Sequence, residues 1–175
     1  MPTLINPQSI VPEMDLPLLG GGRLNIRDAE PENFTIIIAY RGLHCPKCRD
    51  QLQAADPIVA DLKSRGYDVV AVSMDGEAKA RKTRMDWELK NIPVAYDLDL
   101  MTAKAWGLFI SDKREGSEEP DIFSEPGLFV VKPDGALYAE YVQNTPFGRP
   151  PLADIANGLD FVVEKGYPTR GTSTA

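Results

Sequence analysis

The stretch FTIIIAYRGLHCPKC, residues 34–48, joins a largely apolar run to the only two cysteines of the chain. Its first part, residues 34–40, is apolar at almost every position, which is typical of a central strand covered on both faces. Pro46 suits the first position of a helix, because its missing N–H would have no partner there. The stretch therefore predicts a buried strand followed by a helix that begins at Pro46, with Cys45 at the N-cap.

Helix geometry gives the two cysteines a chemical role. Cys45 and Cys48 lie one turn apart, so their Cα atoms are expected about 5 Å from each other, within the range of a disulfide. The free N–H groups of the first turn point toward the Cys45 sulfur, and the helix dipole favours negative charge at that end. An ordinary cysteine is about 3% thiolate at pH 7, whereas a pKa about two units lower makes it roughly three-quarters thiolate. Cys45 is therefore the predicted nucleophile, and Cys48 the thiol that resolves the product.

Three other interpretations of this pair are open. A zinc site needs two further ligands, but the chain has no second cysteine pair, and its only histidine, His44, adjoins Cys45. A c-type haem site requires a histidine after the second cysteine, where Arg49 stands. The third alternative is two inert thiols packed near a helix start. The preceding strand, Pro46 and the Cys-x-x-Cys spacing together favour redox chemistry.

The composition is typical of a soluble globular protein. The chain has 175 residues, of which 43% are hydrophobic and 26% charged, which predicts one domain with a real core. A net charge of −7 argues against a nucleic-acid or anionic-membrane partner. No stretch has the length of a membrane span and the start of the chain lacks a signal-peptide pattern, so a cytoplasmic location is expected. In that compartment a lone Cys-x-x-Cys is more often catalytic than structural.

The order of the expected elements indicates an α/β fold. Residues 1–22 are expected to form an extended N-terminal arm and turn, residues 23–166 one domain, and residues 167–175 a flexible tail. Strands alternate with helices before a late hairpin, which predicts a central, mostly parallel sheet with an antiparallel C-terminal hairpin and helices on both faces. In such sheets the active site lies beyond the carboxyl ends of the strands, where Cys45 falls. The expected strands are 24–26, 34–40, 67–74, 92–96, 128–131 and 136–142, and the expected helices run from Pro46 to a stop at Gly66, over 77–90, from the Asp99 cap to about 107, and from Pro150 onward.

Three local features of this pattern are specific enough to be tested. Pro57 lies inside the first helix and must kink it or restart it with Asp56 as the cap. Met85 and Leu89 are expected to point inward from the polar second helix. The charged, turn-rich segment SDKREGSEEPD, residues 111–121, is expected to be an exposed loop.

The chain resembles the thioredoxin-like superfamily and, more closely, the peroxiredoxins and peroxiredoxin-like proteins of the alkyl hydroperoxide reductase/thiol-specific antioxidant family. The resemblance runs from about Leu16 to Lys165, and the order and spacing of its segments carry it. The string Tyr-Arg-Gly followed by Cys-Pro-x-Cys is particularly similar to a subgroup with a dithiol site. The segments are YRGLHCPKC at 40–48, VVAVSMDG at 69–76, PVAYDLDLMTAKAWGL at 93–108, GLFVVKPDGALYAEYV at 127–142 and TPFGR at 145–149.

Two departures from the family pattern bear on peroxide chemistry. Typical peroxiredoxins place a proline, three residues, a threonine and two residues before the peroxidatic cysteine, and this chain has Ile38 and Gly42 at those two positions. They also carry an arginine just before the Gly-Leu-Phe strand, where this chain has Pro126. In the family this threonine and this arginine help to bind the peroxide oxygens and to stabilise the thiolate. The overall resemblance implies peroxide substrates, whereas the absence of this threonine and arginine and the presence of Pro126 favour disulfides.

The resemblance also implies roles for residues around the cysteines. Thioredoxins carry a cis-proline before this strand, and the backbone of the preceding residue pairs with an incoming peptide. The resemblance therefore implies a cis Glu125–Pro126 bond with both residues binding substrate, and a trans bond that enters the strand is the alternative. Arg41 is a candidate for the missing guanidinium, and an exposed charge at the strand end is the alternative. A protonated His44 would stabilise the neighbouring thiolate, unless its side chain points away from the sulfur.

Together these features predict a thiol-dependent antioxidant oxidoreductase, similar to peroxiredoxins, that needs no metal and no organic cofactor. The Cys45 thiolate attacks a peroxide or a disulfide, and Cys48 resolves the product to a Cys45–Cys48 disulfide. An external thiol donor of thioredoxin, glutaredoxin or glutathione type then reduces that disulfide. The alternatives are a protein disulfide reductase that uses the same pair, and a non-catalytic redox-sensing or binding protein. A homodimer is compatible with the resemblance, and no nucleic-acid or membrane partner is expected.

Overall fold

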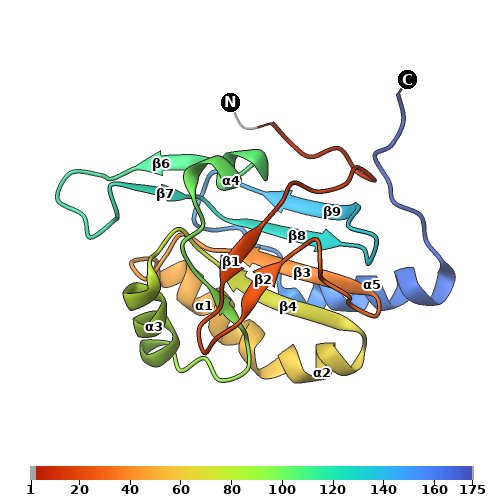
Figure 1. Ribbon diagram of the computed structural model, residues 1–175, viewed down its shortest axis with the longest axis horizontal. Helices are drawn as coiled ribbons and strands as arrows, with labels where there is room; N and C mark the ends of the chain where they lie inside the picture. Colours follow the sequence, from red (N-terminus) through yellow and green to blue (C-terminus); the bar gives the residue numbers. More distant parts are fainter. Residues whose placement is uncertain (1–2, 175) are drawn as a thin grey trace.

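A central sheet of five strands organises the computed structural model, which describes residues 3–174 (Figure 1). Residues 1–2 of the expected arm and residue 175 of the expected tail lie outside this range. Within the range, no helix has both the length and the apolar character needed to cross a membrane. The strands are β1 (Asp15–Pro17), β2 (Arg23–Asn25), β3 (Phe34–Ala39), β4 (Tyr67–Val72), β5 (Val94–Ala95), β6 (Ile110–Asp112), β7 (Ile122–Ser124), β8 (Gly127–Val131) and β9 (Leu137–Val142). The helices are α1 (Pro46–Ala55), the 3₁₀ turn η1 (Asp56–Ile58), α2 (Val59–Ser64), α3 (Glu77–Asp86), α4 (Leu100–Ala105) and α5 (Leu152–Lys165).

The strand directions confirm the predicted sheet, whose order is β5-β4-β3-β8-β9. β3 and β4 run parallel, as do β4 and β5. β8 lies antiparallel to β3, and β9 lies antiparallel to β8. The C-terminal hairpin therefore completes one side of the sheet against the three parallel strands. The short strand expected at 24–26 is β2, which pairs with β1 in a separate two-stranded ribbon.

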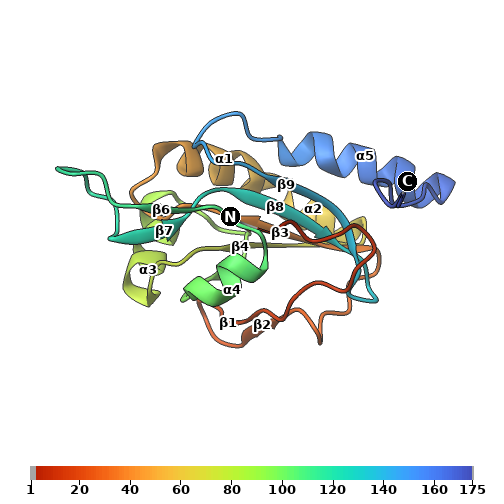
Figure 2. The same cartoon turned by 90° about the horizontal axis from the view of Figure 1, so that it is seen from above.

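Both faces of the sheet are covered, as the apolar run 34–40 predicts. Ile36 and Ile38 pack in one cluster with side chains of α1, α2 and α5. Ile37 and Ala39 pack in a second cluster with side chains of the β1–β2 ribbon and α4. Seen from above, α1 and α5 lie on one side of the sheet, and the ribbon and α4 lie on the other (Figure 2). The alternation of successive side chains between two buried faces explains why the strand has no polar alternation.

The described part of the N-terminal segment packs against the ribbon face of the sheet. It contains β1, and the apolar side chains of Val11, Met14 and Leu16 are buried. At the other terminus, residues 167–174 contain no helix or strand, and Thr169 is buried.

Pro57 restarts the first helix, but Asp56 does not cap the new one. α1 ends just before Asp56, and a single 3₁₀ turn leads into α2. The alternative in which Asp56 caps the restarted helix was wrong, because its carboxylate is used elsewhere. It accepts the backbone N–H groups of Lys90, Asn91 and Ile92 at 3.1, 2.8 and 2.8 Å. Asp56 thereby ties the joint between α1 and α2 to the segment that precedes β5.

The inward direction predicted for Met85 was wrong. The buried stripe of α3 runs through Ala80 and Thr83 and continues to Trp87 just beyond the helix. This spacing of three and four residues leaves Met85 on the other side, where it is 75% exposed. Leu89 is buried as predicted, but it lies past the end of α3.

The segment expected as an exposed loop includes part of a hairpin. β6 and β7 pair antiparallel, so residues 113–121 form the loop between them. The hairpin projects from the body of the molecule (Figure 1). Most of the loop is exposed, as expected, but Glu119 is only 4% exposed. The charge pattern did not distinguish this glutamate from its solvated neighbours.

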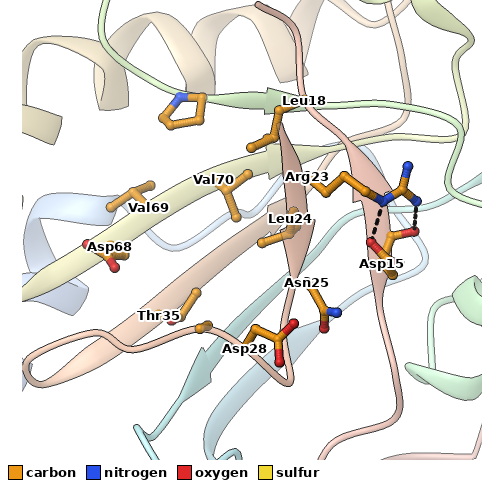
Figure 3. A pocket seen from close by; sticks show the side chains of 12 residues that line it. Asp15, Leu18, Arg23, Leu24, Asn25, Asp28, Thr35, Asp68, Val69 and Val70 are labelled. Carbon is orange, nitrogen blue, oxygen red and sulfur yellow. Dashed lines mark hydrogen bonds and ion pairs between the residues drawn. The ribbon is translucent and has the colours of Figure 1, made fainter. Parts of the chain in front are cut away.

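A cavity of about 460 Å³ lies between the β1–β2 ribbon and strands β3 and β4 (Figure 3). Asp15 and Arg23 of the ribbon form an exposed ion pair of 2.6 Å beside it. Thr35 and Val70 reach it from the sheet. None of its lining residues is a cysteine, so this cavity is separate from the dithiol pair.

We predict that Asp56→Ala destabilises the fold by about 2–4 kcal/mol, because three backbone N–H groups lose their acceptor. Chemical denaturation measures the loss, and the exposed Asp50→Ala is the matched control, expected within about 0.5 kcal/mol of the native chain. Burial raises the pKa of Asp56, but the hydrogen bonds outweigh it and the net pKa is lowered. This stabilisation is therefore present above the unfolded-state pKa of about 3.9 and is lost as the pH falls through the lower folded-state pKa. Equal stability of the two variants would contradict the assignment.

Candidate active site

Cys45 lies at the N-terminus of α1, beyond the carboxyl end of β3. Its backbone is extended (φ −100°, ψ 107°), and α1 begins at the next residue, Pro46. The N–H of Cys48 donates to the Cys45 sulfur at 3.2 Å, so this sulfur caps the helix. The predicted N-cap and the predicted place of Pro46 are confirmed, and the helix N-terminus favours a negative charge on the sulfur.

A tight turn held by Asp75 presents Cys45. The Asp75 carboxylate accepts the N–H of Leu43 at 2.8 Å, and the carbonyl of Gly42 accepts the N–H of Cys45 at 3.1 Å. Gly42 has a φ of 133°, and a Cβ at this position would lie 2.8 Å from Asp75 Oδ2. Both the backbone conformation and the available space therefore require glycine here.

The guanidinium of Arg149 contacts both sulfurs. Its Nη2 lies 3.0 Å from Cys48 Sγ and 3.6 Å from Cys45 Sγ. The rest of the guanidinium is held by the Gln51 side-chain oxygen at 2.7 Å and by the Pro146 carbonyl at 3.0 Å. Both cysteines are free thiols and are buried, with exposures of 1% and 0%. A substrate therefore reaches the sulfurs only after a covering side chain moves.

The surroundings make the two sulfurs chemically different. The side chain and N–H of Cys48 and the guanidinium groups of Arg149 and Arg41 outweigh burial and lower the pKa of Cys45 to about 5. Burial and the adjacent Cys45 raise the pKa of Cys48 well above its ordinary value. At neutral pH, Cys45 is therefore a thiolate and Cys48 is a thiol that donates to it.

Arg41 points into the site rather than into solvent. Its side chain is only 12% exposed, and its Nε donates to Glu125 Oε2 at 2.9 Å. Its Nη2 donates to Glu119 Oε1 at 3.3 Å. The Arg41 guanidinium contributes to the lowered pKa of Cys45, and its backbone N–H donates to Cys48 Sγ at 3.3 Å. The alternative of an exposed charge at the strand end was wrong.

His44 does not supply a positive charge to the site. Burial, followed by the guanidinium of Arg41, lowers the pKa of His44 to about 4, so the ring is neutral at neutral pH. Among the described residues, neither buried ring nitrogen has a hydrogen-bond partner. The ring packs edge-to-face on Phe123, with centroids 4.9 Å apart. A protonated imidazole is disfavoured here, because a cation would be desolvated beside Arg41.

No peptide bond within residues 3–174 is cis, so the expected cis Glu125–Pro126 bond was wrong. The chain runs directly from β7 into β8 at this point. The N–H of Glu125 donates to the Phe109 carbonyl at 2.7 Å, and the Pro126 carbonyl accepts the N–H of Gln143 at 3.2 Å. The Glu125 N–H and the Pro126 carbonyl are thus used within the protein. Glu125 takes part through its carboxylate instead.

Arg149 is a site residue that sequence reasoning missed. It lies 101 residues from Cys48, in the segment TPFGR. That segment contributes to the family resemblance, but no spacing connects it to the cysteines. Its place follows from the connection between β9 and α5, which brings Arg149 against α1.

A cavity of about 370 Å³ opens beside Arg149, between α1 and the segment that leads to α5. Lys47 and Gln51 line it from α1, and Phe147 and Arg149 line it from the opposite segment. Since Arg149 also contacts both sulfurs, its side chain connects this cavity to the buried cysteines.

The arrangement brings a thiolate, two guanidinium groups and a second thiol to one place. Such a set can reduce a weak bond between two heteroatoms, in a peroxide or in a disulfide. Across residues 3–174, no group of three or more His, Cys, Asp or Glu side chains is arranged to hold a metal ion.

Comparisons with known proteins point to one family. The model of the AhpC/TSA family matches residues 7–140, whereas no curated protein matches the chain. The fold is similar to that of a peroxiredoxin-like protein from Aquifex aeolicus, with 18% identity and a TM-score of 0.74, covering 91% of this chain and 89% of that one. It is also similar to AhpC from Enterococcus faecalis, with 18% identity and a TM-score of 0.73, covering 93% of this chain and 98% of that one. A third similar structure is reduced Prx3 from Vibrio vulnificus in complex with H₂O₂, with 18% identity and a TM-score of 0.73, covering 89% and 99%.

We predict that Arg149→Ala raises the pKa of Cys45 by about 1–2 units, because the thiolate loses an adjacent cation. The measurement is the pH dependence of alkylation by iodoacetamide in a Cys48→Ser protein, whose hydroxyl keeps a donor beside Cys45. In the Cys48→Ser protein with Arg149 intact, the rate should rise through a midpoint below the ordinary cysteine pKa. Arg49→Ala, which removes an exposed arginine from the same helix, is the matched control and should leave the midpoint in place. An unchanged midpoint in Arg149→Ala would show that this guanidinium does not stabilise the thiolate.

Proposed function

The chain belongs to the AhpC/TSA family, and on this premise we propose that it is a thiol-dependent peroxidase with Cys45 as nucleophile and Cys48 as resolving thiol. The observation that carries the proposal is the contact of one guanidinium, that of Arg149, with both sulfurs at the N-terminus of α1. The family supplies the type of reaction. The lowered pKa of Cys45, about 5, makes this sulfur a thiolate at neutral pH.

In the first step, the Cys45 thiolate attacks the terminal oxygen of a peroxide, ROOH. An S–O bond forms as the O–O bond breaks, so the sulfur is oxidised to a sulfenic acid and the peroxide is reduced. The leaving oxygen departs with the electron pair as RO⁻ and takes a proton to give ROH. The guanidinium groups of Arg149 and Arg41 are the donors placed to stabilise the charge that develops on this oxygen.

In the second step, the Cys48 sulfur attacks the Cys45 sulfenic acid. A Cys45–Cys48 disulfide forms, and the hydroxyl leaves as water with the proton of the Cys48 thiol. The negative charge on Cys45 is one cause of the raised pKa of Cys48. Oxidation of Cys45 removes that charge, and the Arg149 guanidinium, 3.0 Å away, then favours the Cys48 thiolate. The first step therefore activates the second thiol.

The cycle closes when two external thiol groups reduce the disulfide. We propose a donor of thioredoxin, glutaredoxin or glutathione type, and a reducing compartment such as the cytoplasm. Both sulfurs are buried and in contact with Arg149, so we expect the donor to gain access when this side chain moves. A homodimer is compatible with the cycle, which needs only residues of one chain.

We predict that the reduced protein reacts with hydrogen peroxide at least about a hundredfold faster than a free thiol, as preorganised donors allow. Stopped-flow oxidation combined with mass spectrometry measures the rate and the product. The native chain should lose two thiols and gain one disulfide. Cys45→Ser should lose the rapid reaction, and Cys48→Ser should stop at a sulfenic acid that dimedone traps.

The same proteins are also mixed with a small disulfide, because the sequence leaves a disulfide reductase as the alternative. Rapid reduction of the disulfide, together with peroxide reduction no faster than by a free thiol, would contradict the peroxidase proposal. A disulfide that forms but is not turned over by any thiol donor would indicate a redox sensor instead.

A further inference from the structure

The loop of the β6–β7 hairpin reaches the cysteine site through a buried carboxylate. Glu119 lies in the hairpin loop and is buried, although the adjacent Glu118 is exposed. Its Oε1 accepts from Arg41 Nη2 at 3.3 Å and from Arg114 Nε at 3.0 Å. Its Oε2 accepts the backbone N–H of Arg114 at 2.9 Å and the Ser117 hydroxyl at 3.1 Å. The carboxylate thus joins the fold of the loop to an arginine at the end of β3.

Other side chains of the hairpin and its base hold the same guanidinium. Glu125 Oε2 accepts from Arg41 Nε at 2.9 Å, and its Oε1 accepts from the Ser111 hydroxyl at 2.6 Å. The ring of Phe123 lies against the guanidinium, with Arg41 Cζ 4.8 Å from the ring centroid. Arg41 is therefore fixed by two carboxylates and an aromatic face, all from residues 119–125.

The charges of this cluster separate the roles of the two arginines. Two carboxylates oppose the single positive charge of Arg41, and the Arg114 side chain is largely exposed. Arg149, in contrast, is held by neutral groups, the Gln51 amide and a carbonyl. The two carboxylates reduce the positive charge that Arg41 presents to Cys45, so they do not stabilise the thiolate by charge. Their contribution to the site is to fix the position of the Arg41 guanidinium.

We propose that Glu119 is a positioning residue of the cysteine site, which holds the Arg41 guanidinium in reach of Cys45 and makes the β6–β7 hairpin part of that site. Glu119 acts through Arg41 and has no hydrogen bond to either sulfur in the described structure. Its effect on peroxide reduction rests on the proposed function, whereas its effect on the Cys45 thiolate does not.

The test compares Glu119→Ala with Glu118→Ala, which makes the same change one residue away on an exposed side chain. Both are made in the Cys48→Ser protein, and the pH midpoint of Cys45 alkylation is measured. Glu119→Ala should raise the midpoint by about 0.5–1 unit, because Arg41 is no longer held near the thiolate. Glu118→Ala should leave it unchanged. Glu119→Gln keeps an oxygen acceptor for Arg41, so its midpoint should stay at the parent value or fall below it.

Two results would overturn the proposal. If Glu119→Ala and Glu118→Ala have the same pH midpoint of alkylation, Glu119 has no effect on the Cys45 thiolate. A fall of similar size in both Glu119→Ala and Glu119→Gln would show that the carboxylate acts only as an opposing charge.

Loss of Glu119 removes one of the two carboxylates that pair with the buried Arg41 cation. Glu119→Ala is therefore also made in an Arg41→Gln protein, in which this cation is absent. There it should cause no further shift of the midpoint. A shift as large as in the Arg41 protein would mean that Glu119 does not act through Arg41.

The rate with hydrogen peroxide is measured on the same series with Cys48 present. A native chain unreactive toward peroxide would refute the proposed function, while the alkylation midpoints would still decide the role of Glu119.

Discussion

A negative charge on a buried sulfur has to be compensated by the protein, and the site depends on this requirement. Burial raises the pKa of a thiol, and it is the largest cause of the raised pKa of Cys48. Cys45 is equally buried, yet its pKa is lowered, because the helix N-terminus, the Cys48 side chain and two guanidinium groups are directed at it. The pair therefore carries one negative charge at a time. Arg149 contacts both sulfurs, so the same cation can stabilise the charge first on Cys45 and then on Cys48 in the proposed cycle.

This requirement explains which parts of the chain meet at the end of β3. The turn before α1 brings Cys45 to the helix N-terminus, with Asp75 holding the N–H of Leu43. The connection between β9 and α5 contributes Arg149. The β6–β7 hairpin fixes Arg41 through Glu119. Asp75, Arg149 and Glu119 themselves lie on irregular backbone next to a regular element, as is common where a rigid scaffold positions reactive groups.

The features that the sequence predicted well are local ones. The Cys45 N-cap, Pro46 at the helix start and the doubly covered strand depend on neighbouring residues and on periodicity. The features that it missed depend on contacts between distant segments. Arg149 contacts Cys48 from 101 residues away, and the buried Glu119 contacts Arg41, which lies just past the end of β3, from 78 residues away. A charged loop and an isolated arginine carry no periodic signal that would reveal such partners.

The departures from the peroxiredoxin pattern follow from the same geometry. At Gly42, where the family pattern has threonine, a Cβ would collide with Asp75, so no hydroxyl can stand there. The donors near Cys45 are instead the guanidinium groups of Arg41 and Arg149. A hydroxyl both donates and accepts hydrogen bonds, whereas a guanidinium only donates. Donors alone interact weakly with a neutral peroxide and strongly with the negative charge on its leaving oxygen. A site of this kind favours the transition state over the bound substrate, which is the condition for accelerating the chemical step.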